Sequence, residues 1–97
     1  MVLRSPKISE QEVDAIAAMR NISEEILRLI AANRLWMKNY STVSNLAKNP
    51  KTPITVSIHL LPRLMEKEIR FLAKDRSVPD TVRKGAQRIL QMKGSSH

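Results

Sequence analysis

The chain has 97 residues, of which 42% are hydrophobic, only two are glycine and none is cysteine, and its formal net charge is +8. This length supports one domain with a modest core, and the composition favours an all-α fold over a β-sandwich or a disordered tail. The absence of cysteine excludes disulfide scaffolds, thiol catalysis and thiolate metal sites.

The first half of the chain predicts three helices. Ser9 is a typical N-cap with acidic residues in the turn that follows it, so we expect a first helix over about 9–19. Ser23 opens a second helix in the same way, over about 22–33. A third helix is expected over about 34–47, where apolar residues recur at helical spacing.

The third segment contains the single tryptophan of the chain. Trp36 and Tyr40 lie four residues apart on its apolar stripe, which continues through Val43 and Ala47. The two rings could form a stacking platform or a hot spot for a partner. Their place on the apolar stripe favours packing in the core instead.

A fourth helix is predicted over about 53–61, with Thr52 as its N-cap and Pro53 at its first position. Pro62 is expected to end it, because a proline inside a helix costs about 3 kcal/mol or more. On a helical wheel this segment is apolar on two opposite sides. One side holds Ile54, Ile58 and Leu61, and the other holds Val56 and Leu60. Such a helix is expected to lie between two neighbours, as an interior layer of a stack.

Two further helices are predicted, over about 66–74 and about 78–92. Gly85 within the second of them costs about 1 kcal/mol relative to alanine and indicates the close approach of another helix. We assign residues 1–93 to a single helical-repeat domain. The Gly-Ser-Ser-His sequence at 94–97 is typical of a tag remnant.

One segment of the chain is repeated. Residues 47–56 are echoed 26 positions later by residues 73–82. In each copy a helix ends on Ala-Lys, a short polar loop follows, and the next helix begins at a proline. Repetition of this kind indicates stacked units. We therefore expect about six short helices in three stacked hairpins, as in a fragment of a right-handed α-solenoid.

The repeated motif also resembles a known family. Leu-Ala-Lys-Asn-Pro-Lys-Thr-Pro at 46–53, Leu-Ala-Lys-Asp at 72–75 and Val-Pro-Asp-Thr-Val-Arg at 78–83 resemble the leucine-rich repeat variant and the broader HEAT-like α-solenoids of bacteria, over about 46–90. The stretch is also similar to a segment of a group of uncharacterised bacterial proteins. Because the spacing departs from the strict repeat of the variant family, we expect ordinary α-helical pairs rather than alternating α and 3₁₀ helices. The resemblance implies a surface that binds proteins, or in some cases nucleic acid, within a longer chain, and it implies no catalytic residue.

Basic residues are concentrated in the second half, where residues 49–97 carry ten Lys or Arg against four Asp or Glu. A basic surface could bind phosphates, which makes nucleic-acid binding one interpretation. The other interpretation is a solvated helical face interleaved with carboxylates. The lack of a Gly-rich phosphate loop and of interleaved exposed aromatics favours this second interpretation. The candidate interaction surface consists of Lys48, Lys51, Arg63, Lys67, Arg70, Lys74, Arg76, Arg83, Lys84 and Arg88.

No residue pattern indicates a catalytic, cofactor-binding or metal site. His59 lies beside Thr55 without a neighbouring acid or nucleophile, so we expect it at the surface or at a boundary. Glu66 and Glu68 are two residues apart and diverge on a helix, which argues against a catalytic carboxylate pair.

We therefore predict a non-catalytic, cytoplasmic interaction module that binds a protein partner, with nucleic-acid binding by the basic face of residues 48–88 as the alternative. No apolar run approaches the ~20 residues that a membrane span needs, and no membrane partner is expected. Residues 2–6 read like the end of an earlier helix and a loop, so we expect the chain to be part of a longer protein. Its terminal helices are then expected to offer surfaces for self-association.

Overall fold

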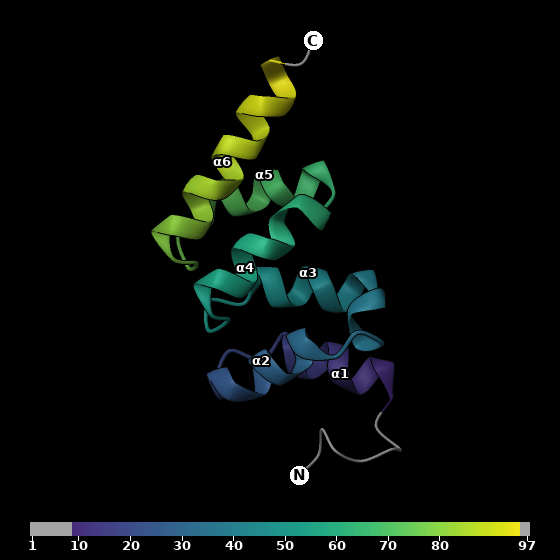
Figure 1. Ribbon diagram of the computed structural model, residues 1–97. Coiled ribbons are helices and arrows are strands. Elements are labelled where there is room, and N and C mark those ends of the chain that lie inside the picture. The colour runs from purple at the N-terminus through teal and green to yellow at the C-terminus, as the bar shows by residue number, and fades with distance from the viewer. Residues whose placement is uncertain (1–8, 96–97) are drawn as a thin grey trace.

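The computed structural model describes residues 9–95, and within them the chain forms six α-helices, two short 3₁₀ helices and no strand (Figure 1). The all-α prediction is confirmed for this part of the chain. None of the helices described is long and apolar enough to cross a membrane. The elements are α1 (Glu10–Ala17), α2 (Glu24–Ala32), η2 (Trp36–Lys38), α3 (Tyr40–Lys48), α4 (Ile54–Leu60), η3 (Leu61–Arg63), α5 (Glu66–Lys74) and α6 (Asp80–Ser95).

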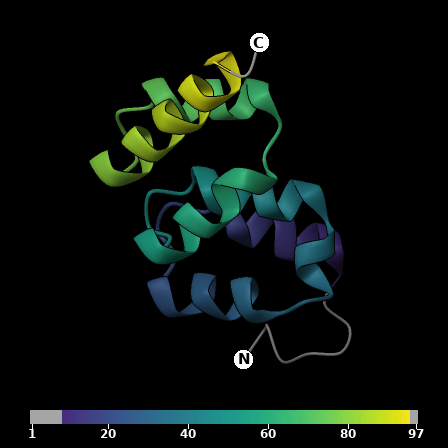
Figure 2. The same ribbon diagram turned by 45° about the horizontal axis from the view of Figure 1, so that its top comes forward.

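The helices follow one another along an elongated body of 46 × 23 × 17 Å. The α1 and α2 helices lie at one end, and α5 and α6 pack side by side at the other (Figures 1 and 2). Between these ends α3 contacts α1 on one side and α4 on the other, and α4 also contacts α6. The buried hydrophobic residues therefore form one cluster that extends along the length of the molecule, from Val13 of α1 to Ala86 of α6.

The α4 helix lies between α3 and α6, as its two apolar sides predict. Ile58 and Leu61 face Gly85 of α6 so closely that a Cβ atom on Gly85 would lie 3.2 Å from Ile58 Cδ1 and 3.0 Å from Leu61 Cδ1. The close approach predicted at Gly85 is confirmed. Leu60 is buried, whereas Ile54 in the first turn of α4 is 41% exposed. The two-sided burial therefore does not extend to the beginning of the helix.

The predicted third helix is divided into η2 and α3, so the prediction of one continuous helix over 34–47 is wrong. The backbone is extended at Asn39, with φ −82° and ψ 113°, and the Asn39 side chain accepts a hydrogen bond from the Ser41 N–H. An asparagine that bonds its own backbone competes with the helical hydrogen bonds, which explains the break. Trp36 and Tyr40 thus lie on different elements, yet both are partly buried and pack against the core as predicted.

The two copies of the repeated loop have the same backbone geometry. Asn49 and Asp75 end α3 and α5 with φ/ψ of −79°/119° and −78°/114°. In each case Oδ1 accepts the N–H two residues later, from Lys51 or Ser77, at 2.9 Å. The copies differ in the second polar atom of the capping side chain. In Asp75 this atom is Oδ2, which is buried without a hydrogen-bond partner among the described residues.

The start of α4 corrects one local prediction. Pro53 occupies the N-cap position rather than the first helical position, since its ψ of 138° is extended and its carbonyl accepts hydrogen bonds from Val56 and Ser57. The Thr52 hydroxyl does not cap α4. It donates to the Leu46 carbonyl at 2.8 Å and so stabilises the end of α3.

The ends of the other helices largely agree with the predictions. Pro62 ends α4, and the chain continues as the 3₁₀ turn η3. The expectation of ordinary α-helical pairs without 3₁₀ helices is therefore wrong at this position. The α6 helix continues to Ser95, three residues beyond its predicted end, and so includes the first part of the 94–97 segment. The rest of that segment, and residues 2–6, which were predicted to be the end of an earlier helix and a loop, lie outside the described residues.

Candidate interaction surface of α1, α3 and α5

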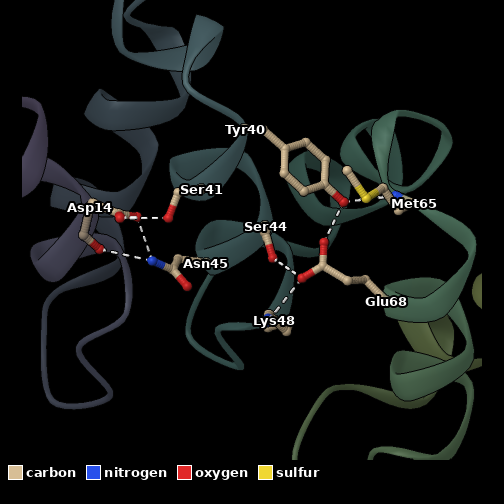
Figure 3. Close-up of polar contacts among 8 residues, drawn as sticks. All are labelled: Asp14, Tyr40, Ser41, Ser44, Asn45, Lys48, Met65 and Glu68. Carbon is tan, nitrogen blue, oxygen red and sulfur yellow. Dashed lines mark hydrogen bonds and ion pairs between the residues drawn. The ribbon is translucent and has the colours of Figure 1, made fainter.

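The polar residues of α3 form two parallel rows that face different helices. One row consists of Tyr40, Ser44 and Lys48, which repeat every four residues and reach Glu68 of α5. The adjacent row consists of Ser41, Asn45 and Asn49, which reach α1. Figure 3 shows the side chains of α3 directed to Asp14 on one side and to Glu68 on the other. Positions four apart lie on the same face of a helix, so this spacing allows α3 to hold both neighbours.

Glu68 is the centre of the first set of contacts. Its carboxylate accepts hydrogen bonds from the hydroxyls of Tyr40 and Ser44, and its Oε2 lies 3.1 Å from Lys48 Nζ (Figure 3). The Tyr40 oxygen also accepts the Met65 N–H at 2.8 Å. The Glu68 side chain is only 15% exposed, so these contacts are shielded from water more than an ordinary surface ion pair. They join α3 to the start of α5.

The environment keeps Glu68 ionised. Burial raises the pKa of its carboxyl, but hydrogen bonds from Ser44, Tyr40 and Lys48 outweigh burial and leave the pKa below its usual value. The pKa of Tyr40 is raised, first by burial and then by its hydrogen bond to the Glu68 carboxylate. At neutral pH the pair is thus a carboxylate and a neutral phenol. This is a structural anchor rather than an acid–base pair poised for proton transfer.

The second row joins α3 to α1. The Asp14 carboxylate accepts the Ser41 hydroxyl at 2.6 Å, and Asn45 Nδ2 donates both to that carboxylate and to the Asp14 carbonyl, the latter at 3.1 Å. Asn49 Nδ2 donates to the carbonyls of Ala17 and Met19 at 2.8 and 2.6 Å. Both amide groups therefore use their N–H donors within the fold. They satisfy carbonyl oxygens at the end of α1, where intrahelical partners are lacking.

A pocket of about 230 Å³ lies between these two sets of contacts. Asn45, Lys48 and Asn49 of α3 and its C-cap line it, together with residues from α5 and from the end of α1. Phe71 of α5 borders the pocket with 54% of its surface exposed, and Lys48 Nζ lies 5.8 Å from the centre of its ring. An ammonium at that distance is attracted by the face of the ring. The full lining is Ala18, Arg20, Asn45, Lys48, Asn49 and Phe71.

The ten predicted basic residues fall into two groups. Five have a side-chain partner: Lys48 and Arg63 contact other elements, through Glu68 and the Met37 carbonyl, whereas Arg70 pairs with Glu66, and Arg83 and Lys84 pair with Asp80, within their own helices. The other five are exposed, and their side chains have no ion-pair or hydrogen-bond partner within residues 9–95: Lys51, Lys67, Lys74, Arg76 and Arg88. Of the ten, Lys48 alone lines the pocket.

On α5 the unpaired lysines stand beside the exposed ring. Lys67 precedes Phe71 by four residues and Lys74 follows it by three, so all three lie on one exposed face of the helix. The sequence analysis did not single out Phe71 and so missed an exposed aromatic residue among cations. It also missed Arg20, Asn45 and Asn49 as pocket residues. The four-residue spacing of polar residues along α3 was the signal available for the last two.

The remaining candidates have structural explanations. His59 is exposed, and its Nδ1 donates to the Thr55 carbonyl at 2.7 Å, as a surface histidine would. Glu66 pairs with Arg70 on the surface of α5 while Glu68 faces α3, so the predicted divergence of the two carboxylates is confirmed. Among the described residues no three His, Asp or Glu side chains are grouped to hold a metal ion.

Comparison with protein-family models, with curated proteins and with solved structures found no match to this chain. Its function is therefore inferred from its own residues.

Proposed function

We propose that the chain is a non-catalytic helical-repeat interaction module that binds a protein partner, as part of a longer cytoplasmic protein. The observation that carries the proposal is Phe71, an aromatic side chain 54% exposed beside a pocket at the junction of three helices. Exposed aromatic rings beside a pocket are typical anchors for a partner, because they contribute a large contact area at little entropic cost. The neighbouring Asn45, Asn49 and Glu68 side chains hold the helices together, which supports a binding role for the exposed ring.

The repeat architecture is part of the proposal. We interpret α1–α2, α3–α4 and α5–α6 as three stacked hairpins of a HEAT-like, right-handed α-solenoid related to the leucine-rich repeat variant. The matching geometry of the loops at Asn49 and Asp75 supports this interpretation, as does the place of α4 between α3 and α6. In such a stack α1, α3 and α5 form one continuous face, and proteins of this architecture use faces of this kind for binding.

The proposal is tested by capturing partners from native cells after nuclease treatment, with the wild-type chain and two variants as baits. Phe71→Ser removes the exposed ring beside the pocket. Leu29→Ser is the matched control, since Leu29 is 44% exposed on α2 and does not line the pocket. We expect a protein that the wild type and Leu29→Ser retain and Phe71→Ser loses. If all three baits retain the same proteins equally, Phe71 is not part of a binding surface, and the observation that carries the proposal is lost.

Self-association is a second form of protein binding, and an apolar surface at the α5–α6 end of the molecule supports it. A mainly apolar pocket of about 300 Å³ lies among η3, α5 and α6, lined by Pro62, Ile69, Ile89 and Met92. Met92 is 64% exposed there. If two chains pair through this face, Met92→Lys reduces the sedimentation coefficient measured at high concentration to that of a monomer. If the wild type is already monomeric under those conditions, the face does not pair.

Nucleic-acid binding is the alternative function, and the five unpaired basic residues favour it. Phosphate binding by several cations releases counterions, so the logarithm of affinity falls with the logarithm of salt concentration by about 0.9 for each phosphate contact on a duplex. Titration of a labelled duplex and of a labelled single strand at low and at moderate salt measures this slope. Absence of binding at low salt would eliminate the alternative.

A further inference from the structure

We propose that the pocket between α1, α3 and α5 binds an acidic peptide segment, with a carboxylate between Arg20 and Lys48 and an apolar side chain against Phe71. This inference rests on the proposed function, since it names the chemistry of the partner that the module would bind. The pocket has room for a side chain and is open to solvent, as a surface that receives a peptide must be.

The two cations of the pocket supply the charge for this ligand. Arg20 is exposed and has no hydrogen-bond or ion-pair partner among the described residues, so its guanidinium is available for a carboxylate. Lys48 uses one contact on Glu68, and an ammonium has three N–H donors, so it retains donors for a second anion. Glu68 and the Phe71 ring already hold Lys48 in position, which reduces the entropy lost on binding.

The two amide side chains of the pocket limit which other hydrogen-bonding groups the ligand can carry beside its carboxylate. Asn45 donates both of its N–H groups to Asp14 of α1, and Asn49 donates to the Ala17 and Met19 carbonyls at and beyond the end of α1, so neither amide can donate to an anion. Asn49 Oδ1 accepts the Lys51 N–H, whereas Asn45 Oδ1 accepts no hydrogen bond within the described part of the chain. The pocket thus combines cations with one open acceptor. A peptide matches this combination, because it carries carboxylates together with backbone N–H donors.

The charge around the pocket favours a short acidic segment over a polyanion. Asp14 is bonded to Asn45 on the α1 side, and Glu68 is bonded to Lys48 on the α5 side. Both carboxylates lie near the pocket without lining it, so a phosphate backbone that extended beyond the pocket would approach more negative charge than a single carboxylate held inside it, and like charges repel. The unpaired Lys67 and Lys74 flank Phe71 on α5 and extend the positive charge along that helix. The cations that line the pocket itself are Arg20 and Lys48, and two cations match one or two carboxylates.

The experiment uses fluorescence anisotropy with the purified chain and a library of short labelled peptides built from Asp, Glu, Leu and Phe. A matched library carries Asn and Gln in place of the acids. We expect members of the acidic library to bind and their neutral counterparts to fail. Arg20→Glu should weaken the best acidic peptide by about tenfold or more, and Phe71→Ala should weaken peptides that contain Leu or Phe most.

The matched control for charge is Arg34→Glu, which changes the net charge equally. Arg34 is an exposed arginine between α2 and η2 and does not line the pocket. Its reversal should change affinity by less than about twofold. Equal loss in both variants would mean general charge attraction and would overturn the inference. Far-ultraviolet circular dichroism verifies that each variant is folded.

Two other results would also overturn the inference. One is that no acidic peptide binds more tightly than its neutral counterpart. The other is that a labelled single-stranded oligonucleotide binds more tightly than any peptide and loses its affinity in Arg20→Glu. A protein that is captured by the wild type and lost in Phe71→Ser, while every acidic peptide fails, would sustain the proposed function and refute only the chemistry assigned to the pocket.

Discussion

Replacement of Glu68 by alanine should destabilise the protein by about 2–4 kcal/mol, because one carboxylate satisfies three groups from α3. A hydrogen bond to a charged group contributes about 1.5–3 kcal/mol, and a buried polar group left without a partner costs about 1–3 kcal/mol. Ser44 is 5% exposed and would lose its acceptor. Lys48 is 34% exposed along its side chain and would regain water, so the sum of the individual values overestimates the loss.

Urea denaturation followed by far-ultraviolet circular dichroism measures this change. For a domain of this size the expected loss corresponds to a fall in Tm of roughly 10–25 °C. The matched control is Glu66→Ala, two residues away on the same helix. Glu66 is 49% exposed and its partner Arg70 67% exposed, so this ion pair should contribute no more than about 0.5 kcal/mol.

The reasoning is refuted if Glu68→Ala loses less than about 1 kcal/mol or no more than Glu66→Ala. A second measurement tests the contacts themselves. Tyr40→Phe should destabilise the wild type more than it destabilises the Glu68→Ala variant, because its hydroxyl has already lost its acceptor in that variant. Equal effects in the two backgrounds would show that the phenol and the carboxylate do not interact.

Three further changes should also alter stability. The folded pKa of Glu68 lies below its unfolded value, so the stability that the ionised carboxylate contributes is present above the unfolded pKa and is lost as pH falls through the folded pKa. The difference in unfolding free energy between the wild type and Glu68→Ala should therefore shrink on acidification. A difference that stays constant with pH would contradict this. Asn49→Ala should lose about 2–4 kcal/mol in urea denaturation, and clearly more than Asp75→Ala in the second loop, because only Asn49 donates to two carbonyls of another segment. Gly85→Val should cost about 1–3 kcal/mol, because its branched side chain would displace the Cδ1 atoms of Leu61 and Ile58 from their places in the core, and a Tm equal to that of the wild type would show that these side chains move aside freely.

The ends of several helices could be predicted because their signals lie within a few residues of one another. The Ser9 hydroxyl accepts the Glu12 N–H at 3.1 Å, and the Glu12 side chain returns a bond to the Ser9 N–H at 3.0 Å. Ser23 caps α2 through the Ile26 N–H in the same way. Each of these contacts spans three residues and depends little on the rest of the fold.

Local signals failed where two local structures compete. Asn39 can continue a helix or bond its own backbone, and the side-chain bond to Ser41 prevailed, which divided the third helix. Thr52 can cap the following helix or bond backward, and it bonds the Leu46 carbonyl. Thr52 was predicted as a cap, but of the wrong helix, and Asn39 was not singled out from the sequence. Their partners depended on how the flanking segments turn.

The sequence by itself determined the fold class, the repeated loop and the excess of positive charge, since composition and helical periodicity are local properties of the chain. Only the tertiary structure decided which charged side chains form contacts within the fold and which line the pocket. Glu68 reads as one of several surface carboxylates until packing brings it to Tyr40, 28 residues earlier. Packing likewise brings Arg20, Lys48 and Phe71 to one pocket from three different segments. Such contacts depend on the relative placement of whole helices, which no short stretch of sequence encodes.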